Sequence, residues 1–223
     1  MPTSTFFRLD QVKKEKIINA AKNEFSQVSI QEASIAKIVK EAQIPRGSFY
    51  QYFNSKGDLY FYIFDELRKE PESVFYNLLK ETKGDLFETF RSYFSYFTIE
   101  AFEGENRGFY KNLLSHMNFS SSNRITMSES IEEERPSREE NLAFHQHSSS
   151  ESVQKIMDEV DQSKMKVKST KEFRMLFRLL WSILFNTINE GYRMEETKQR
   201  IDTEGLKQDF NQKISWLQHG VMK

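Results

Sequence analysis

The segment "AKIVKEAQIPRGSFYQYFNSKGDL", residues 36–59, is the most informative part of this chain. Apolar side chains at helical spacing predict one short helix over residues 34–42 and a second over residues 45–53. Pro45 separates the two because it disfavours helix at the preceding residue and suits the first turn of a new helix. The segment is therefore a candidate helix-turn-helix motif.

The second of these short helices has two contrasting faces. Phe49 and Phe53 lie four residues apart, so both point to one side and are expected to be buried. The remaining side chains are expected to face outward or to lie along the flanks: Arg46, Gly47, Ser48, Tyr50, Gln51 and Tyr52. Arginine reads guanine, glutamine reads adenine and glycine lets a backbone approach closely, which suits a DNA groove. Aromatic side chains at helical spacing are also common in protein cores, so the residues alone leave both interpretations open.

Two longer helices are expected on either side of the motif. One spans residues 10–27 with Asp10 as its N-terminal cap, and the other begins at Asn54 or Ser55. Lys56 adds an ammonium group to the free N–H groups and the positive end of the dipole at the start of that second helix. This combination predicts a contact with phosphate.

The composition and the hydropathy of the chain argue against a disulfide-bonded, secreted or membrane-spanning protein. The 223-residue chain has a formal net charge of -1, but residues 1–60 carry nine Lys and Arg against six Asp and Glu. The lack of cysteine excludes disulfides and thiolate metal sites. The most apolar run, residues 175–185, is about half of the ~20 residues that a bilayer span needs, and the start of the chain has no secretory pattern. We expect a cytoplasmic protein without membrane contact.

No sequence motif favours an enzyme. The chain has no glycine-rich phosphate loop, no Glu-x-x-His pair and no nucleophile motif. His145 and His147 would face apart on a helix and have no evident third ligand, so we expect no metal and no cofactor. A helical-bundle enzyme is an alternative without positive support.

The rest of the chain is expected to be helical around a bulky aromatic core. Helical patterns cover residues 71–82, 86–103, 108–119, 153–166, 170–196 and 203–221, whereas residues 120–152 form a polar, partly acidic stretch. The chain contains twenty Phe, and some of these aromatic side chains are candidates to line an apolar pocket. The candidates are Phe90, Phe94, Phe97, Tyr110, Met117 and Phe177. Each of them also suits an ordinary core.

The segment over residues 10–65 resembles the TetR/AcrR family of bacterial transcriptional regulators. The family combines a first helix of the type "II-AA---F" with a helix-turn-helix motif. The end of that motif has Gly, then Ser or Thr, then Leu or Phe, then Tyr, and a few residues later Phe and Lys. The matching positions here are Ile17, Ile18, Ala20, Ala21, Phe25, Ile38, Ala42, Gly47, Ser48, Phe49, Tyr50, Tyr52, Phe53, Ser55, Lys56 and Leu59. The resemblance implies an all-α protein with a three-helix DNA-binding domain over residues 8–68 and a helical effector-binding and dimerisation domain over residues 69–223.

Three positions depart from the family pattern. Ser29 and Gln43 stand where the family often has glycine, and Ala33 stands where it often has threonine. A non-glycine residue in a left-handed turn costs on the order of 1 kcal/mol, which good packing can offset. We therefore expect the turn at Gln43 to differ in detail from that of the family.

The resemblance also implies residue roles and partners. Ser34 and Lys37 are expected to approach phosphates of double-stranded operator DNA, and Lys56 to hold a phosphate at the far edge. The side chains expected in the major groove are Arg46, Gly47, Ser48 and Gln51, with Tyr50 and Tyr52 on its walls. The last two long helices are expected to pair with their symmetry mates in a homodimer, the alternative being a monomer with a thick core.

The function implied is that of a ligand-responsive repressor. A small, largely apolar effector would release the dimer from a palindromic operator. Transcriptional activation by the same fold is an alternative. A helical adaptor that uses the acidic residues 129–140 to bind a protein partner, without binding DNA, is a third possibility.

Overall fold

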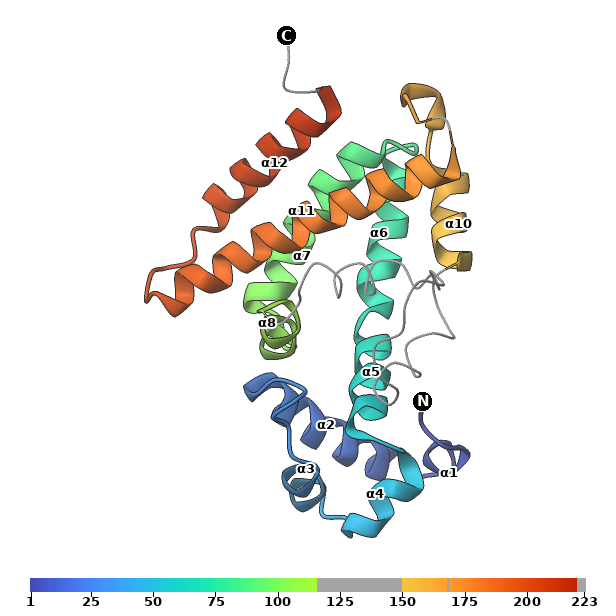
Figure 1. Ribbon diagram of the computed structural model, residues 1–223, viewed down its shortest axis with the longest axis vertical. Helices are drawn as coiled ribbons and strands as arrows, with labels where there is room; N and C mark the ends of the chain where they lie inside the picture. Colours follow the sequence, from blue (N-terminus) through green and yellow to red (C-terminus); the bar gives the residue numbers. More distant parts are fainter. Residues whose placement is uncertain (116–149, 168, 220–223) are drawn as a thin grey trace, which may run out of the picture. The chain divides into compact units, whose positions relative to one another are not determined.

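In the computed structural model, the described residues are 1–115, 150–167 and 169–219, and every regular element among them is helical (Figure 1). The predicted all-α fold is confirmed. None of the described helices is both long enough and apolar enough to cross a bilayer. Most of the polar stretch predicted over 120–152 lies outside the described residues, as do the acidic residues 129–140 and both histidines of its "HQH" sequence.

The helices form two compact units that do not follow the order of the chain. The first unit contains residues 1–69 and also α8 (Arg107–Ser115), and the second contains residues 70–104 and the described residues from 150 onward. A helix from the predicted second domain is thus part of the unit that holds the helix-turn-helix.

The first unit begins with a short helix that the sequence did not predict. Its helices are α1 (Ser4–Phe7), α2 (Gln11–Gln27), α3 (Ile35–Glu41), α4 (Arg46–Tyr52) and α5 (Lys56–Leu67), together with α8. The Asp10 carboxylate accepts a hydrogen bond from the backbone N–H of Lys13 at 2.9 Å, so the predicted cap of α2 is confirmed. The Ser55 hydroxyl caps α5 in the same way by accepting from the N–H of Asp58 at 3.1 Å.

α8 completes the core of the first unit by packing on α2 and α5. The ring of Phe109 stacks on Tyr60 of α5 with centroids 5.0 Å apart. Burial raises the pKa of the Tyr60 hydroxyl, which stays neutral in this apolar setting. The Asn112 side-chain amide donates to the backbone carbonyl of Phe25 at the end of α2 at 3.2 Å.

The second unit is built around two long helices that pack on each other. Its elements are α6 (Lys69–Glu81), α7 (Leu86–Glu103), α10 (Ser150–Glu159), the short 3-10 helix η2 (Gln162–Lys164), α11 (Thr170–Glu196) and α12 (Thr203–His219). Lys213 of α12 lies 3.1 Å from the Glu190 carboxylate of α11 and donates to the Thr187 hydroxyl at 3.2 Å. The Tyr192 hydroxyl of α11 donates to the carbonyl of Ala101 in α7 at 2.7 Å.

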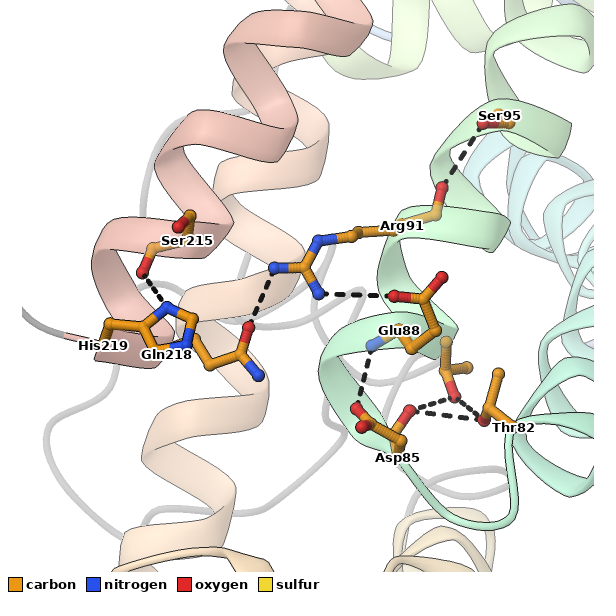
Figure 2. A network of polar contacts seen from close by, with 9 residues as sticks. Thr82, Asp85, Glu88, Arg91, Ser95, Ser215, Gln218 and His219 are labelled. Atoms are coloured by element: carbon orange, nitrogen blue, oxygen red, sulfur yellow. Dashed lines mark hydrogen bonds and ion pairs between the residues drawn. The ribbon is translucent and has the colours of Figure 1, made fainter.

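A polar network on α7 holds the C-terminal part of α12 (Figure 2). The Arg91 guanidinium donates to the Gln218 side-chain oxygen at 2.8 Å and lies 3.5 Å from the Glu88 carboxylate. Asp85 caps the start of α7 by accepting from the N–H of Glu88 at 3.0 Å. A single guanidinium therefore joins the first turns of α7 to the end of α12.

Candidate nucleic-acid interface

The turn between α3 and α4 is a left-handed helix ending. Gln43 has a φ of 55°, so the turn adopts the left-handed backbone although the residue is not glycine. The N–H of Ile44 bonds to the carbonyl of Val39 at 3.0 Å and the N–H of Gln43 to that of Lys40 at 3.2 Å, which is the Schellman pattern. Ile44 and Val39 are both buried, as is usual for the apolar pair that accompanies this helix ending.

One face of α4 is anchored and the other is exposed. Phe49 and Phe53 have no exposed surface, as predicted. Arg46, Gly47 and Gln51 are exposed, Tyr50 retains 49% of its surface, and Ser48 is half-buried. The exposed positions recur at a spacing of three or four residues, so α4 presents one stripe of basic, amide and aromatic groups to solvent.

Gly47 leaves an open space in the middle of this exposed stripe. A Cβ built on Gly47 would meet no atom within 4 Å. Packing inside the protein therefore gives no reason for glycine at this position. A helix whose backbone must come close to another molecule would supply that reason.

Two positions of α3 that were predicted to contact phosphate lie next to a buried carboxylate. Glu24 of α2 accepts a hydrogen bond from the backbone N–H of Ser34 at 2.9 Å, and its other oxygen lies 3.6 Å from the ammonium of Lys37. The Lys37 side chain remains 66% exposed, whereas that of Glu24 is 6% exposed. The sequence position of Ser34 predicts a cap for α3, but its hydroxyl makes no capping bond, so that expectation is wrong and the hydroxyl is not committed to the helix end.

Tyr52 does not face outward. It is only 4% exposed, and the sequence-based expectation that it stands on the wall of a groove is wrong on this point. Its ring lies 6.5 Å from that of Phe6 in α1, and the Lys13 ammonium is 5.7 Å from the ring centroid. The physical reason is that Tyr52 follows Phe49 by three residues and shares its inner face, which the unpredicted α1 covers.

Lys56 makes contacts that its sequence position did not reveal. Its ammonium donates to the backbone carbonyls of Gln31 at 2.6 Å and Ala33 at 3.1 Å. An ammonium has three donors, and these two bonds fasten the loop before α3 to the start of α5. Lys56 therefore stabilises the helix-turn-helix by joining two of its segments. Its contact with phosphate stays a prediction, because only one N–H donor of the ammonium group remains for it.

Comparison with known families agrees with this geometry. The family model described as bacterial regulatory proteins, tetR family, matches residues 17–63, and the model for the tetracycline repressor-like C-terminal domain matches residues 85–221. The second match alone covers more than half of the chain. This chain belongs to the TetR family. TetR-family proteins are DNA-binding regulators of transcription and not enzymes, so the chain is a DNA-binding regulator.

Solved structures of two other proteins share the fold. A putative fatty acid metabolism regulator from Clostridium perfringens is 16% identical, with a TM-score of 0.56 over 93% of this chain and 99% of that chain. A TetR transcriptional regulator from Rhodococcus sp. RHA1 is 12% identical, with a TM-score of 0.52 over 95% of this chain and 98% of that chain. At these identities the likeness shows the fold alone. A comparison with curated proteins gave no match.

The candidate effector residues of this TetR-family chain do not form one cluster. Phe90, Phe97 and Phe177 are buried in the second unit, where Phe90 and Phe177 lie 5.9 Å apart. Phe94 stacks instead on Phe210 of α12 at 4.0 Å. Tyr110 belongs to the first unit, and Met117 lies outside the described residues.

A cluster of aromatic rings in the second unit surrounds a residue that was not among the predicted effector contacts, Trp181. The half-buried ring of Trp181 in α11 lies 5.5 Å from Phe75, 5.3 Å from Phe90 and 5.4 Å from Tyr93. These rings come from α6, α7 and α11, and no spacing within one helix connects them. Only the packing of the three helices brings them together.

Proposed function

We propose that this protein is a homodimeric repressor that reads a palindromic operator with α4 in the major groove and leaves it when a small apolar effector binds. Such a repressor would act on the chromosome, in the cytoplasm. The observation that carries the proposal is the exposed stripe of α4, held in place from behind by Phe49 and Phe53. Arg46 suits a guanine edge and Gln51 an adenine edge, while the exposed Tyr50 would reach a phosphate at the side of the groove.

Phosphate contacts would come from the helix before the turn. Lys37 keeps most of its side chain in solvent, and the uncommitted hydroxyl of Ser34 lies on the same α3 N-terminal turn. Contacts of this kind set the position of a protein on the duplex without reading its sequence. Lys56 would add a further phosphate contact through its remaining donor.

Gly47→Ala provides the sharpest test of α4. The added methyl meets nothing in the protein, so the variant should fold with unchanged or slightly higher stability, since alanine favours helix over glycine. The same methyl would separate the helix backbone from DNA, and we expect operator affinity to fall about tenfold or more. Fluorescence anisotropy with DNA from upstream of the gene measures the affinity.

Gly57→Ala is a matched control for this variant. Gly57 is also the second residue of its helix, and its added Cβ would lie 3.4 Å from the Ser55 hydroxyl, an ordinary contact. We expect the control to bind DNA as the unaltered protein does. Equal affinity of the Gly47 variant and the unaltered protein would remove α4 from the interface.

The dimer is proposed on an exposed apolar face of the last two helices. Met175 and Leu179 of α11 are 53% and 46% exposed, and Trp216 of α12 is 53% exposed. The opposite side of α11 is buried within the second unit through residues such as Phe177 and Leu184. A helix with apolar side chains on both sides needs a partner on the second side, and a second copy supplies one of matching character.

Leu179→Glu tests this interface. A carboxylate on the apolar face opposes burial against a second copy, so sedimentation should detect monomers at micromolar concentration. Lys171→Glu changes an exposed position on the same helix and should leave the dimer intact. A Leu179→Glu protein that remains dimeric with normal helix content would place the interface elsewhere.

The effector site is proposed around Trp181. This tryptophan lies among the rings of Phe75, Phe90 and Tyr93 and is still partly accessible, so an apolar molecule entering there would change its emission. The chain has two Trp, and Trp216→Phe leaves Trp181 as the only reporter. Titration with dodecanoate should change the emission of that variant and release labelled operator DNA over the same range of concentration.

The reciprocal variant controls for binding elsewhere. Trp181→Phe keeps Trp216 on the proposed dimer face, and its emission should not respond to the ligand. A response seen only through Trp216 would contradict the proposed site.

A further inference from the structure

The C-terminal end of α4 is held by the segment that precedes the helix-turn-helix. α4 has only seven residues, and the last carbonyls of any helix lack donors within the helix. Thr3 supplies two such donors. Its backbone N–H donates to the carbonyl of Tyr52 at 2.9 Å, and its hydroxyl donates to the carbonyl of Gln51 at 2.6 Å.

The hydroxyl of Thr3 is used in an unusual way. Thr3 is the N-terminal cap residue of α1, where a threonine side chain commonly bonds to its own helix. Here its side chain makes no capping bond to α1 and reaches across to α4 instead. The bond therefore stabilises the end of another helix, and it does so at the backbone of Gln51, an exposed residue of the α4 stripe.

An aromatic side chain anchors the same segment. Phe6 of α1 has no exposed surface, and its ring lies 4.8 Å from Phe53 and 5.3 Å from Tyr62. Phe53 is one of the two residues that hold α4 from behind. Phe6 thus fixes α1 to the inner face of α4, and Thr3 bonds to the end of the same helix.

We propose that Thr3 and Phe6 together form a brace that positions α4 for DNA without contacting DNA themselves. This inference rests on the proposed role of α4 as the reading helix. In the absence of the brace the end of α4 would sample other positions, and operator affinity would fall by the fraction of molecules with the helix out of place. Because no phosphate contact is lost, the dependence of affinity on salt should not change.

Thr3→Val in the full-length chain tests the brace. The variant keeps the shape of the side chain and the backbone bond to Tyr52, and it loses only the hydroxyl bond to Gln51. We expect operator binding to weaken about threefold, as befits one lost hydrogen bond, with the slope of affinity against salt concentration unchanged. Thr3→Ser restores the hydroxyl and should bind within about twofold of the unaltered protein.

Thr5→Val is the matched control, because Thr5 is an exposed residue of the same short helix. It should bind normally. Phe6→Ala should weaken binding more than Thr3→Val, and thermal unfolding of each variant shows whether the unit still folds. Hydrogen exchange at the end of α4 should quicken in Thr3→Val but not in Thr5→Val.

Three outcomes would overturn the brace. Thr3→Val binding equal to that of the unaltered protein would show that the hydroxyl bond has no role, and failure of Thr3→Ser to restore binding would show that the hydroxyl is not the relevant group. A salt slope lowered by about one would mean that the segment touches phosphate itself.

Arg46→Ala and Gly47→Ala, measured in parallel, separate this inference from the one on which it rests. If these two variants lose affinity and Thr3→Val does not, the brace alone is wrong. If Arg46→Ala and Gly47→Ala bind normally, α4 is not the reading helix and the proposed function fails.

Discussion

Two glycines, one in each unit, lie in helices but have opposite surroundings. A Cβ on Gly47 of α4 would meet nothing, whereas a Cβ on Gly191 of α11 would collide with the ring of Phe102 and lie 2.9 Å from the Leu206 side chain. At Gly191 the missing side chain allows helices to pack closely within the protein. At Gly47 it leaves a helix surface bare where DNA is proposed to lie. The contrast separates a residue retained for packing from one that packing does not require.

The largest effect is expected from removing one of the two buried phenylalanine rings that fix α4 to the core of the first unit. Phe53→Ala removes a fully buried ring that lies 4.8 Å from Phe6 and 5.8 Å from Phe49, and such changes cost about 3–5 kcal/mol. We expect the first unit to unfold at a lower temperature and operator binding to be lost, while sedimentation still detects the dimer of the second unit. Phe7→Ala, at a ring that is 54% exposed, is the control. Normal binding by Phe53→Ala would show that α4 does not depend on this core.

Gly191→Ala should have the reverse effect of Gly47→Ala. The added methyl forces Phe102 and Leu206 aside, and overpacking of this kind costs about 1–3 kcal/mol. We expect a lower denaturation midpoint of the second unit and unchanged DNA affinity of the folded protein. If both glycine variants altered stability, or both altered only DNA binding, the distinction between the two glycines would be lost.

Lys37→Ala separates phosphate contact from base reading within the first unit. Loss of one phosphate contact lowers the slope of log affinity against log salt by about one and weakens binding to all sequences alike. Gln51→Ala should instead relax preference at one base position with the slope unchanged. Binding titrations at several salt concentrations, on operator and altered operator, measure both. A base-specific effect of Lys37→Ala would place α3 deeper in the groove than proposed.

The smallest effect is expected at the turn. Gln43→Gly removes the strain of a left-handed backbone at a non-glycine residue, which is on the order of 1 kcal/mol. Glycine also has more conformational freedom in the unfolded chain, which lowers stability by roughly 0.5–1 kcal/mol. The net stabilisation should be a few tenths of a kcal/mol by chemical denaturation. Gln43→Ala keeps the strain and should gain nothing. Destabilisation of Gln43→Gly by more than about 1 kcal/mol would mean that the glutamine side chain itself holds the turn.

Local pattern was enough to predict much of the first unit. The cap at Asp10, the cap at Ser55, which was one of two candidates, and the buried pair Phe49 and Phe53 all follow from neighbours a few residues away. Such features depend on backbone geometry and helical period, which a sequence displays directly. The α4 residues that face solvent were also predicted, but Tyr52, which was predicted to be among them, is buried. The cap expected at Ser34 does not form.

The failures share one cause. α1 has four residues and too little periodicity to be detected, so the cover over Tyr52 was missed. The bonds of Lys56 to the carbonyls of Gln31 and Ala33 join positions more than twenty residues apart. Trp181 sits among rings from three helices, and its neighbours have no fixed spacing along the chain.

The sequence by itself determined that the chain is helical, that residues 34–53 form a helix-turn-helix, and that the chain resembles TetR-family regulators, because helical period, caps and motif spacing are local properties. Only the tertiary structure decided that Tyr52 is buried and that α8 joins the first unit. It also decided that Lys56 bonds to the loop before α3 and that Thr3 bonds to the end of α4. These features depend on contacts between segments that are distant in the sequence. Which segment buries a given apolar surface or bonds to a given carbonyl is determined only when the chain has folded.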